Sequence, residues 1–151
     1  MYSKPDVIIV EGHVIFRKCL ISFLTNENIA TVIGEASDVN GFTELLPHLK
    51  PDLVIMDIDL PNTNGIEATK KAMTLIPGIK IIAYSVFGNE EDYCIMTELG
   101  VKGFILKSNI ISELEKTIRI VMMGTSNYSN EINRKTNHKL SGKKNSFNRS
   151  N

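Results

Sequence analysis

The alternation of apolar and polar stretches along the chain predicts five strands, each followed by a helix. Five apolar runs rich in Ile or Val have the length of buried strands, at residues 6–10, 31–36, 53–57, 80–85 and 103–106. Apolar residues recur at helical spacing in the intervening segments 14–26, 39–49, 65–75, 90–99 and 110–123. In the last helix, one stripe is expected to face the core, formed by Ile111, Leu114, Ile118 and Val121.

This order of elements predicts a doubly wound α/β domain with a five-stranded parallel sheet. Strands that are apolar at almost every position are buried on both faces, and right-handed crossover connections place helices over both faces of a parallel sheet. In such sheets, ligand sites form beyond the carboxyl ends of the strands. The polar residues at the strand ends are therefore the candidates for function.

Five polar residues stand at or just after the ends of four predicted strands. Glu11 follows the first strand, Asp57 and Asp59 end or follow the third, Ser85 ends the fourth, and Lys107 follows the fifth. Each one alone fits a solvated strand end. Because they all fall on the same edge of the sheet, we expect them to form one site.

The chemistry of this set points to a metal ion and to phosphoryl transfer. Clustered carboxylates raise one another's proton affinity unless a cation neutralises them, and oxygen ligands suit Mg²⁺. Glu11, Asp57 and Asp59 are the candidate metal ligands. A carboxylate can also attack phosphorus to form an aspartyl phosphate, for which Asp57 is the best candidate. Lys107 would offset the phosphoryl charge, and Ser85 would hydrogen-bond a phosphoryl oxygen.

Length and composition indicate one cytosolic domain. The chain has 151 residues, of which 42% are hydrophobic, enough for one core. The two cysteines, Cys19 and Cys94, have no metal-ligand spacing, which favours a reducing compartment. The sequence contains neither an apolar run that could span a bilayer nor a signal peptide, so we expect no membrane partner.

The charge distribution separates a body from a tail. The net charge is +0, but residues 125–151 hold 6 of the 17 basic residues and 1 of the 17 acidic ones. A basic segment with few large apolar residues cannot bury enough surface to fold alone, so residues 125–151 are expected to be a flexible linker or tail. The folded domain is expected to span residues 5–124.

Three motifs carry a resemblance to a known family. The stretches PDLVIMDIDLPNTNGIE, IIAYS and LGVKGFILK, within residues 5–124, resemble the receiver domains of bacterial two-component response regulators. The resemblance implies a flavodoxin-like (βα)5 fold with strand order 2-1-3-4-5. It also implies that Asp57 is the phosphoacceptor, Lys107 the phosphate-binding lysine, Ser85 the switch hydroxyl and Phe104 the switch aromatic. Phe104 fits a core aromatic equally well.

The stretch VEGHVIFRKCLISFL resembles the receiver subfamily that precedes a LuxR-type helix-turn-helix DNA-binding domain. This resemblance implies a regulatory module rather than an enzyme, with a sensor histidine kinase as partner and a possible homodimer. DNA would be bound only through a C-terminal domain that is absent from this chain. The chain is then either truncated, which we favour, or a stand-alone receiver.

One position departs from the family pattern. Most receivers have two adjacent acids after the first strand, whereas this chain reads Glu11-Gly12. The Asp59 side chain either replaces the missing magnesium ligand or faces solvent.

Two functions remain open. The main hypothesis is a phosphorylation switch, which the presence of Asp57, Ser85 and Lys107 favours. The alternative, which Gly12 favours, is an interaction module that works without phosphorylation. Flavin binding is disfavoured, because EGHVIF is not a phosphate-cradling loop.

Overall fold

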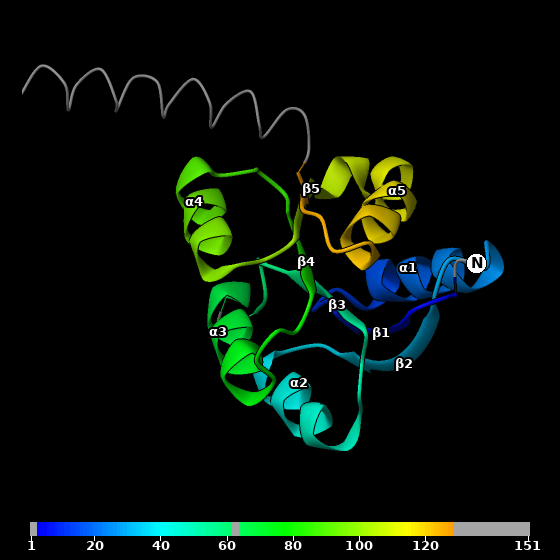
Figure 1. Ribbon diagram of the computed structural model, residues 1–151, viewed down its shortest axis with the longest axis horizontal. Coiled ribbons are helices and arrows are strands. Elements are labelled where there is room, and N and C mark those ends of the chain that lie inside the picture. The colour runs from blue at the N-terminus through cyan, green and yellow to red at the C-terminus, as the bar shows by residue number, and fades with distance from the viewer. Residues whose placement is uncertain (1–2, 62–63, 129–151) are drawn as a thin grey trace, which may run out of the picture.

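The computed structural model describes residues 3–61 and 64–128, which form a parallel sheet covered by helices on both faces (Figure 1). The strand order is β2-β1-β3-β4-β5-β6, and every pair of neighbours is parallel. The strands are β1 (Asp6–Val10), β2 (Thr31–Ala36), β3 (Leu53–Asp57), β4 (Ile81–Ser85), β5 (Gly103–Leu106) and β6 (Asn127–Tyr128). The predicted fold class and the order 2-1-3-4-5 are confirmed, and a sixth strand is added.

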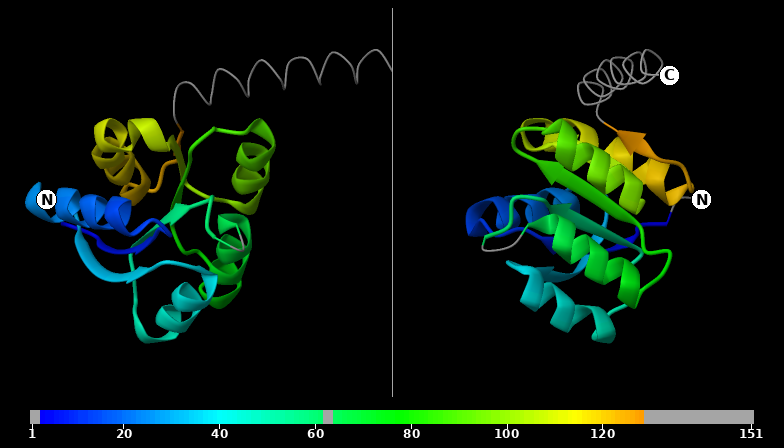
Figure 2. Two further views of the ribbon diagram at one scale, coloured as in Figure 1. Left: turned by 180° about the vertical axis from the view of Figure 1, so that it is seen from behind. Right: turned by 90° about the vertical axis from the view of Figure 1, so that its left-hand side faces the viewer.

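The helices divide between the two faces of the sheet. They are α1 (Val14–Asn26), α2 (Val39–Leu45), α3 (Gly65–Leu75), α4 (Glu90–Leu99) and α5 (Ile110–Met122), with short 3-10 turns at Leu46–His48 and Lys107–Asn109. Helices α1 and α5 cover one face, and α2, α3 and α4 cover the other (Figures 1 and 2). None of the helices in the described part of the chain is long and apolar enough to cross a membrane.

Alternation along the strands produces two separate cores. In β1, Val7 and Ile9 pack with residues of α1 and α5, whereas Ile8 and Val10 pack with residues of α2, α3 and α4. All four side chains are fully buried. The near-continuous apolar runs in the sequence therefore reflect strands that are buried on both faces.

The buried stripe of α5 differs by one residue from the prediction. Ile110 is 1% exposed and lies one helical turn before Leu114, whereas Ile111 is 52% exposed. Consecutive residues project about 100° apart around a helix, so Ile111 turns away from the sheet when Ile110 faces it. The prediction for Ile111 was wrong. Residues 110 and 111 are both isoleucine, so the sequence alone does not show which of the two faces the sheet.

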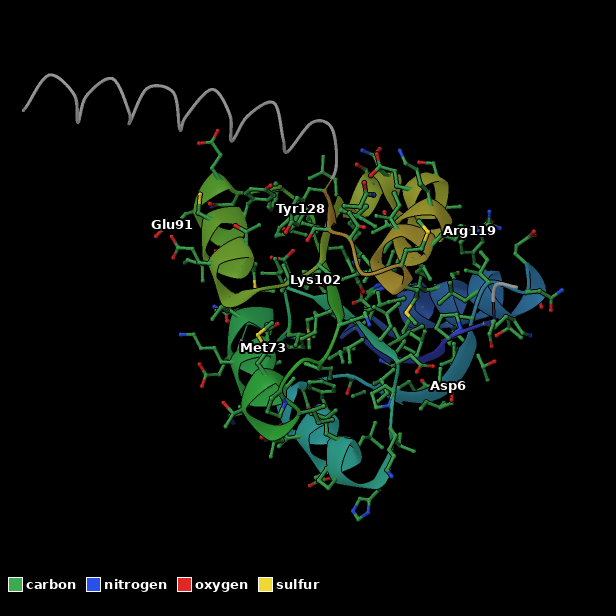
Figure 3. All side chains as sticks on the ribbon, viewed as in Figure 1. Asp6, Met73, Glu91, Lys102, Arg119 and Tyr128 are labelled. Carbon is green, nitrogen blue, oxygen red and sulfur yellow. The ribbon has the colours of Figure 1, made fainter. Side chains whose placement is uncertain are left out.

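The sixth strand was not predicted from the sequence. The Asn127 backbone N–H donates to the Lys102 carbonyl at 2.8 Å, and the Tyr128 hydroxyl donates to the Val101 carbonyl at 3.1 Å. Figure 3 shows Tyr128 between α4 and α5, where its ring meets that of Tyr93 edge-on at 5.6 Å. The sheet thus extends to residue 128, four residues into the tail expected over 125–151, and residues 129–151 lie outside the described residues.

The loop after β3 is held close to β4. The Ile58 N–H donates to the Tyr84 carbonyl at 2.9 Å, and the Gly65 N–H donates to the Ile58 carbonyl at 2.7 Å. A Cβ atom at Gly65 would collide with the Asp57 carbonyl oxygen, so only glycine allows this approach. The backbone that follows Asp57 is therefore fixed against the end of β4.

Candidate functional site

The carboxyl ends of the strands bring together the polar residues that the sequence singled out. Glu11 follows β1, Asp57 ends β3, Ser85 ends β4 and Lys107 follows β5. Glu11, Asp57 and Ser85 are buried, with 1%, 2% and 2% of their surface exposed. Buried polar side chains are costly unless their polar atoms find partners, so the contacts of each decide what the site can do.

The Glu11 carboxylate is the most heavily hydrogen-bonded group of the site. Its Oε1 accepts a hydrogen bond from the Tyr84 hydroxyl at 2.8 Å and lies 3.0 Å from the Lys107 ammonium nitrogen. Its Oε2 accepts a bond from the His13 backbone N–H at 2.7 Å. Burial works to raise the pKa of Glu11, but these bonds outweigh it and the pKa is lowered. Glu11 is therefore ionised.

The Asp57 carboxyl has the opposite shift. Burial, reinforced by the charge of Glu11, raises its pKa to about 7. Only a hydrogen bond from the Asp59 backbone N–H to Asp57 Oδ1, at 2.8 Å, and the Lys107 charge work in the other direction. Of these two neighbouring buried acids, Glu11 is therefore ionised first, and Asp57 becomes ionised only near neutral pH.

Lys107 is held by contacts on two sides. Its ammonium nitrogen lies 3.0 Å from Glu11 Oε1 and 4.3 Å from the centroid of the Phe16 ring. The attraction between a cation and a ring face is strongest where water is excluded, and the Lys107 side chain is 23% exposed. These contacts from β1 and α1 keep the positive charge at the edge of the sheet near Asp57.

Asp59 faces β4 rather than Glu11. Its Oδ2 accepts a hydrogen bond from the Val86 backbone N–H at 3.0 Å and lies 3.5 Å from the Ser85 hydroxyl. The residue itself is exposed to solvent. Asp59 therefore joins the end of β3 to the residue that follows β4.

Comparison with known proteins shows which family has this sequence pattern. The sequence matches the response regulator receiver domain family over residues 7–119. The chain belongs to this family. The family predicted from the motifs around Asp57, Ser85 and Lys107 is therefore confirmed, and the receiver domain is a regulatory module of two-component systems.

Similar curated proteins are transcriptional regulators. The chain is 36% identical over 122 residues to the uncharacterized transcriptional regulatory protein YxjL of Bacillus subtilis, covering 81% of this chain and 56% of the relative. Its identity to LiaR of Bacillus subtilis is 31% over 118 residues, or 78% and 56% of the two chains. DegU of Brevibacillus brevis is 27% identical over 122 residues, or 81% and 52%. This chain spans about half the length of these relatives.

Solved structures have the same fold. A LuxR-family two-component response regulator from Aurantimonas sp. has a TM-score of 0.87 at 24% identity, covering 92% of this chain and 99% of that one. The isolated receiver domain of RcsB from Salmonella enterica with BeF₃⁻ has a TM-score of 0.80 at 23% identity, covering 87% and 98%. At these identities the structures show the fold alone.

The receiver site of this chain offers two carboxylates, rather than three, to a cation. Glu11 and Asp57 provide hard oxygen atoms of the kind that Mg²⁺ prefers, and burial together with the Glu11 charge raises the pKa of Asp57, an effect that a bound cation would oppose. Among residues 3–61 and 64–128, no cluster of three or more His, Cys, Asp or Glu side chains has the arrangement of a metal site. The donor chemistry fits a divalent cation with Glu11 and Asp57, whereas Asp59 is turned toward β4.

Pro61 fills the space that a side chain at position 12 would need. A Cβ atom built on Gly12 would lie 2.5 Å from Cδ and 2.9 Å from Cγ of Pro61. A carboxylate cannot be restored at position 12 without moving that ring. Packing around Gly12 is therefore adapted to the missing acid.

Phe104 is completely buried and stacks edge-on against Tyr93 of α4, with ring centroids 5.4 Å apart. Tyr93 in turn contacts Tyr128 of β6. Phe104 therefore packs in the core and belongs to a row of rings formed with Tyr93 and Tyr128, and its role as the switch aromatic stays a prediction.

Sequence reasoning missed Tyr84 as a member of the site. Its ring is fully buried, and its hydroxyl reaches Glu11 from the residue just before Ser85. Burial and the nearby acids raise the pKa of Tyr84 well above its usual range, so its hydroxyl remains a donor. The signal was present in IIAYS, because a tyrosine in a strand buried on both faces needs a partner for its hydroxyl.

Proposed function

We propose that this receiver domain accepts a phosphoryl group on Asp57 from a sensor histidine kinase and thereby switches a transcriptional regulator. The observation that carries the proposal is the placement of Asp57. It is a buried carboxyl at the tip of β3. The buried Ser85 hydroxyl ends the neighbouring strand β4, and the Lys107 ammonium nitrogen, just after β5, lies 3.0 Å from Glu11 Oε1.

The reaction needs Asp57 as the nucleophile. One Asp57 oxygen attacks the phosphorus of a phosphohistidine; a P–O bond forms while the P–N bond breaks, and the imidazole nitrogen keeps the electron pair. Attack requires the ionised carboxylate, and its pKa of about 7 leaves roughly half of the molecules ionised at neutral pH. Lys107 supplies positive charge for the phosphoryl oxygens, and the Ser85 hydroxyl is positioned to donate to one of them.

A bound Mg²⁺ would neutralise the Glu11–Asp57 pair and the transferring oxygens. Glu11 and Asp57 are the residues that would hold it, and they bring two carboxylates to an ion that prefers six oxygen ligands. We expect water to complete the ligand set, because Gly12 contributes no side chain and Asp59 is directed to Val86. The predicted affinity for Mg²⁺ is accordingly weak.

The output of the switch is proposed to be a change in self-association or in the position of a DNA-binding domain. The relatives named as transcriptional regulatory proteins are about twice as long as the matched region, which supports such a domain beyond the receiver. A solved structure with this fold contains two RcsB dimers bound to two parallel DNAs, with a TM-score of 0.82 at 22% identity, covering 89% of this chain and 69% of that one. Dimerisation and DNA binding are thus part of the proposal for the whole protein.

Intact mass spectrometry after incubation with acetyl phosphate and Mg²⁺ tests the proposal. Wild type is expected to gain one phosphoryl group, and Asp57→Asn is expected to gain none, because an amide is not a nucleophile toward phosphorus. Lys107→Ala serves as a second variant and should reduce the yield strongly. If the wild type gains no mass under conditions that modify another receiver, the proposal is wrong and the phosphorylation-independent module replaces it.

A further inference from the structure

Asp59 occupies two hydrogen-bond donors at the end of β4, and one of them, the Ser85 hydroxyl, is a donor that the proposed reaction would use. The Val86 N–H donates to Asp59 Oδ2 at 3.0 Å, and the buried Ser85 hydroxyl is directed to the same oxygen at 3.5 Å. A backbone N–H and a hydroxyl that converge on one anionic oxygen form a small anion site. In this structure, the anion is a side chain of the protein itself.

The position of Asp59 next to Asp57 is fixed by the backbone. The Asp59 N–H donates to Asp57 Oδ1 at 2.8 Å, so the two residues are tied together at the carboxyl that would receive the phosphoryl group. The Ile58 N–H is bonded to the Tyr84 carbonyl at 2.9 Å, which holds the same turn against β4. The Asp59 carboxylate therefore reaches the end of β4 from the strand tip that carries Asp57.

We propose that the Asp59 carboxylate is an internal competitor that occupies the place of one phosphoryl oxygen, on the Val86 N–H and the Ser85 hydroxyl. The inference rests on the proposed function, because it assigns a further residue to that site. Phosphorylation of Asp57 then requires the Asp59 side chain to leave these donors. Asp59 is exposed, so its carboxylate can move into water at little cost.

This assignment opposes the role that the sequence suggested for Asp59. A metal-binding Asp59 would strengthen the binding of Mg²⁺ and phosphoryl analogues, whereas a competitor for the phosphoryl donors weakens the binding of the analogue. The two roles therefore predict changes of opposite sign when the side chain is removed. The contact with Val86, on the β4 side of Asp57, favours the competitor.

The test compares the affinity for beryllofluoride, in the presence of Mg²⁺, among wild type, Asp59→Ala and Asp92→Asn. Asp92 is the matched control, because the charge of Asp59 contributes to the raised pKa of Asp92, so its own charge acts on the same region. Asp59→Ala is expected to bind the analogue roughly three- to tenfold more tightly, the range that one hydrogen bond represents. Asp92→Asn should change the affinity by less than this.

A second measurement follows the Val86 amide directly. In nitrogen–proton correlation spectra without Mg²⁺ or analogue, Asp59→Ala should shift the Val86 signal and speed its hydrogen exchange, while Asp92→Asn should leave it in place. Unchanged or weaker analogue binding by Asp59→Ala overturns the inference. Equal tightening by Asp92→Asn also overturns it, because general charge repulsion would then explain the effect. Absence of any analogue or phosphoryl binding in wild type and all variants instead overturns the proposed function, and the inference with it.

Discussion

The two flanks of Asp57 differ in burial and in the number of partners. On the β1 side, Glu11 is almost completely buried and binds Tyr84, Lys107 and the His13 backbone at 2.7–3.0 Å. On the β4 side, the exposed Asp59 has one short bond, from Val86, and one long one. The Glu11 flank is therefore a buried hydrogen-bond network in which both carboxylate oxygens have partners, here called the saturated network. The Asp59 flank is a single short hydrogen bond at the protein surface.

The difference in burial and partners suggests different roles for the two flanks. A buried carboxylate with several donors cannot lose one of them without leaving a charge or a donor unsatisfied, so the Glu11 flank resists rearrangement. An exposed carboxylate exchanges one hydrogen bond for water at small cost. We therefore expect the Glu11 flank to set stability and the pKa of Asp57, and the Asp59 flank to change when Asp57 is modified.

The largest expected effect concerns Asp57 itself. Its pKa, raised from 3.8 to about 7, means that the folded protein binds this proton more tightly than the unfolded chain does. The unfolded chain therefore loses this proton near pH 4, whereas the folded protein keeps it until about pH 7, so stability falls as the pH rises between these values. The free energy of unfolding of Asp57→Asn, minus that of wild type, should grow by up to about 1.4 kcal/mol per pH unit in this range and level off above pH 7.

Urea unfolding in EDTA buffers between pH 4.5 and 8.5 measures this difference. Glu11→Gln should weaken the pH dependence, because the Glu11 charge is one cause of the raised pKa. Asp59→Asn should leave the dependence unchanged. A parallel course of wild type and Asp57→Asn over the whole pH range would show that the acid is not perturbed in this way.

The second effect compares the carboxylates of the two flanks at one pH. Glu11→Gln keeps the size of the side chain but removes the partner of Lys107, and breaking a largely buried pair in this way costs about 3 kcal/mol. Asp59→Asn should change the free energy of unfolding by less than about 0.5 kcal/mol, as surface substitutions usually do. Urea unfolding at pH 7.5 provides both values, and equal losses would remove the distinction between the flanks.

Most of the fold was predictable, because β1, β3, β4 and β5 are buried along almost their whole length and each helix has its own apolar stripe. The sixth strand was not, since Asn127 and Tyr128 lack the apolar run of a buried strand and pair only at the edge of the sheet. Glu11, Asp57, Ser85 and Lys107 were found from their positions at or after the strand ends alone. The direction of the Asp59 carboxylate could not be predicted, because it depends on where the end of β4 lies.

The third effect tests Tyr84, the residue that sequence reasoning missed. Tyr84→Phe removes only the hydroxyl that donates to Glu11 at 2.8 Å and leaves the ring in the core. Loss of a buried hydrogen bond to a charged group should lower the free energy of unfolding by about 2 kcal/mol. A loss below about 0.5 kcal/mol for Tyr84→Phe would contradict the saturated network around Glu11.

The smallest expected effect on the free energy of unfolding concerns Ser85. This residue follows Tyr84 in β4, and its hydroxyl is directed to Asp59 rather than to Glu11. Ser85 is buried like Tyr84, but the distance from its hydroxyl to Asp59 Oδ2 is 3.5 Å, at the limit of a hydrogen bond. Ser85→Ala should therefore cost less than about 1 kcal/mol in urea unfolding, even though the Ser85 hydroxyl is proposed to bind the phosphoryl group. The same variant should weaken beryllofluoride binding, because only then does the hydroxyl gain a close acceptor. A stability loss as large as that of Tyr84→Phe would mean that the Asp59 flank is already locked in the unmodified protein, and the two flanks would no longer differ in their freedom to change.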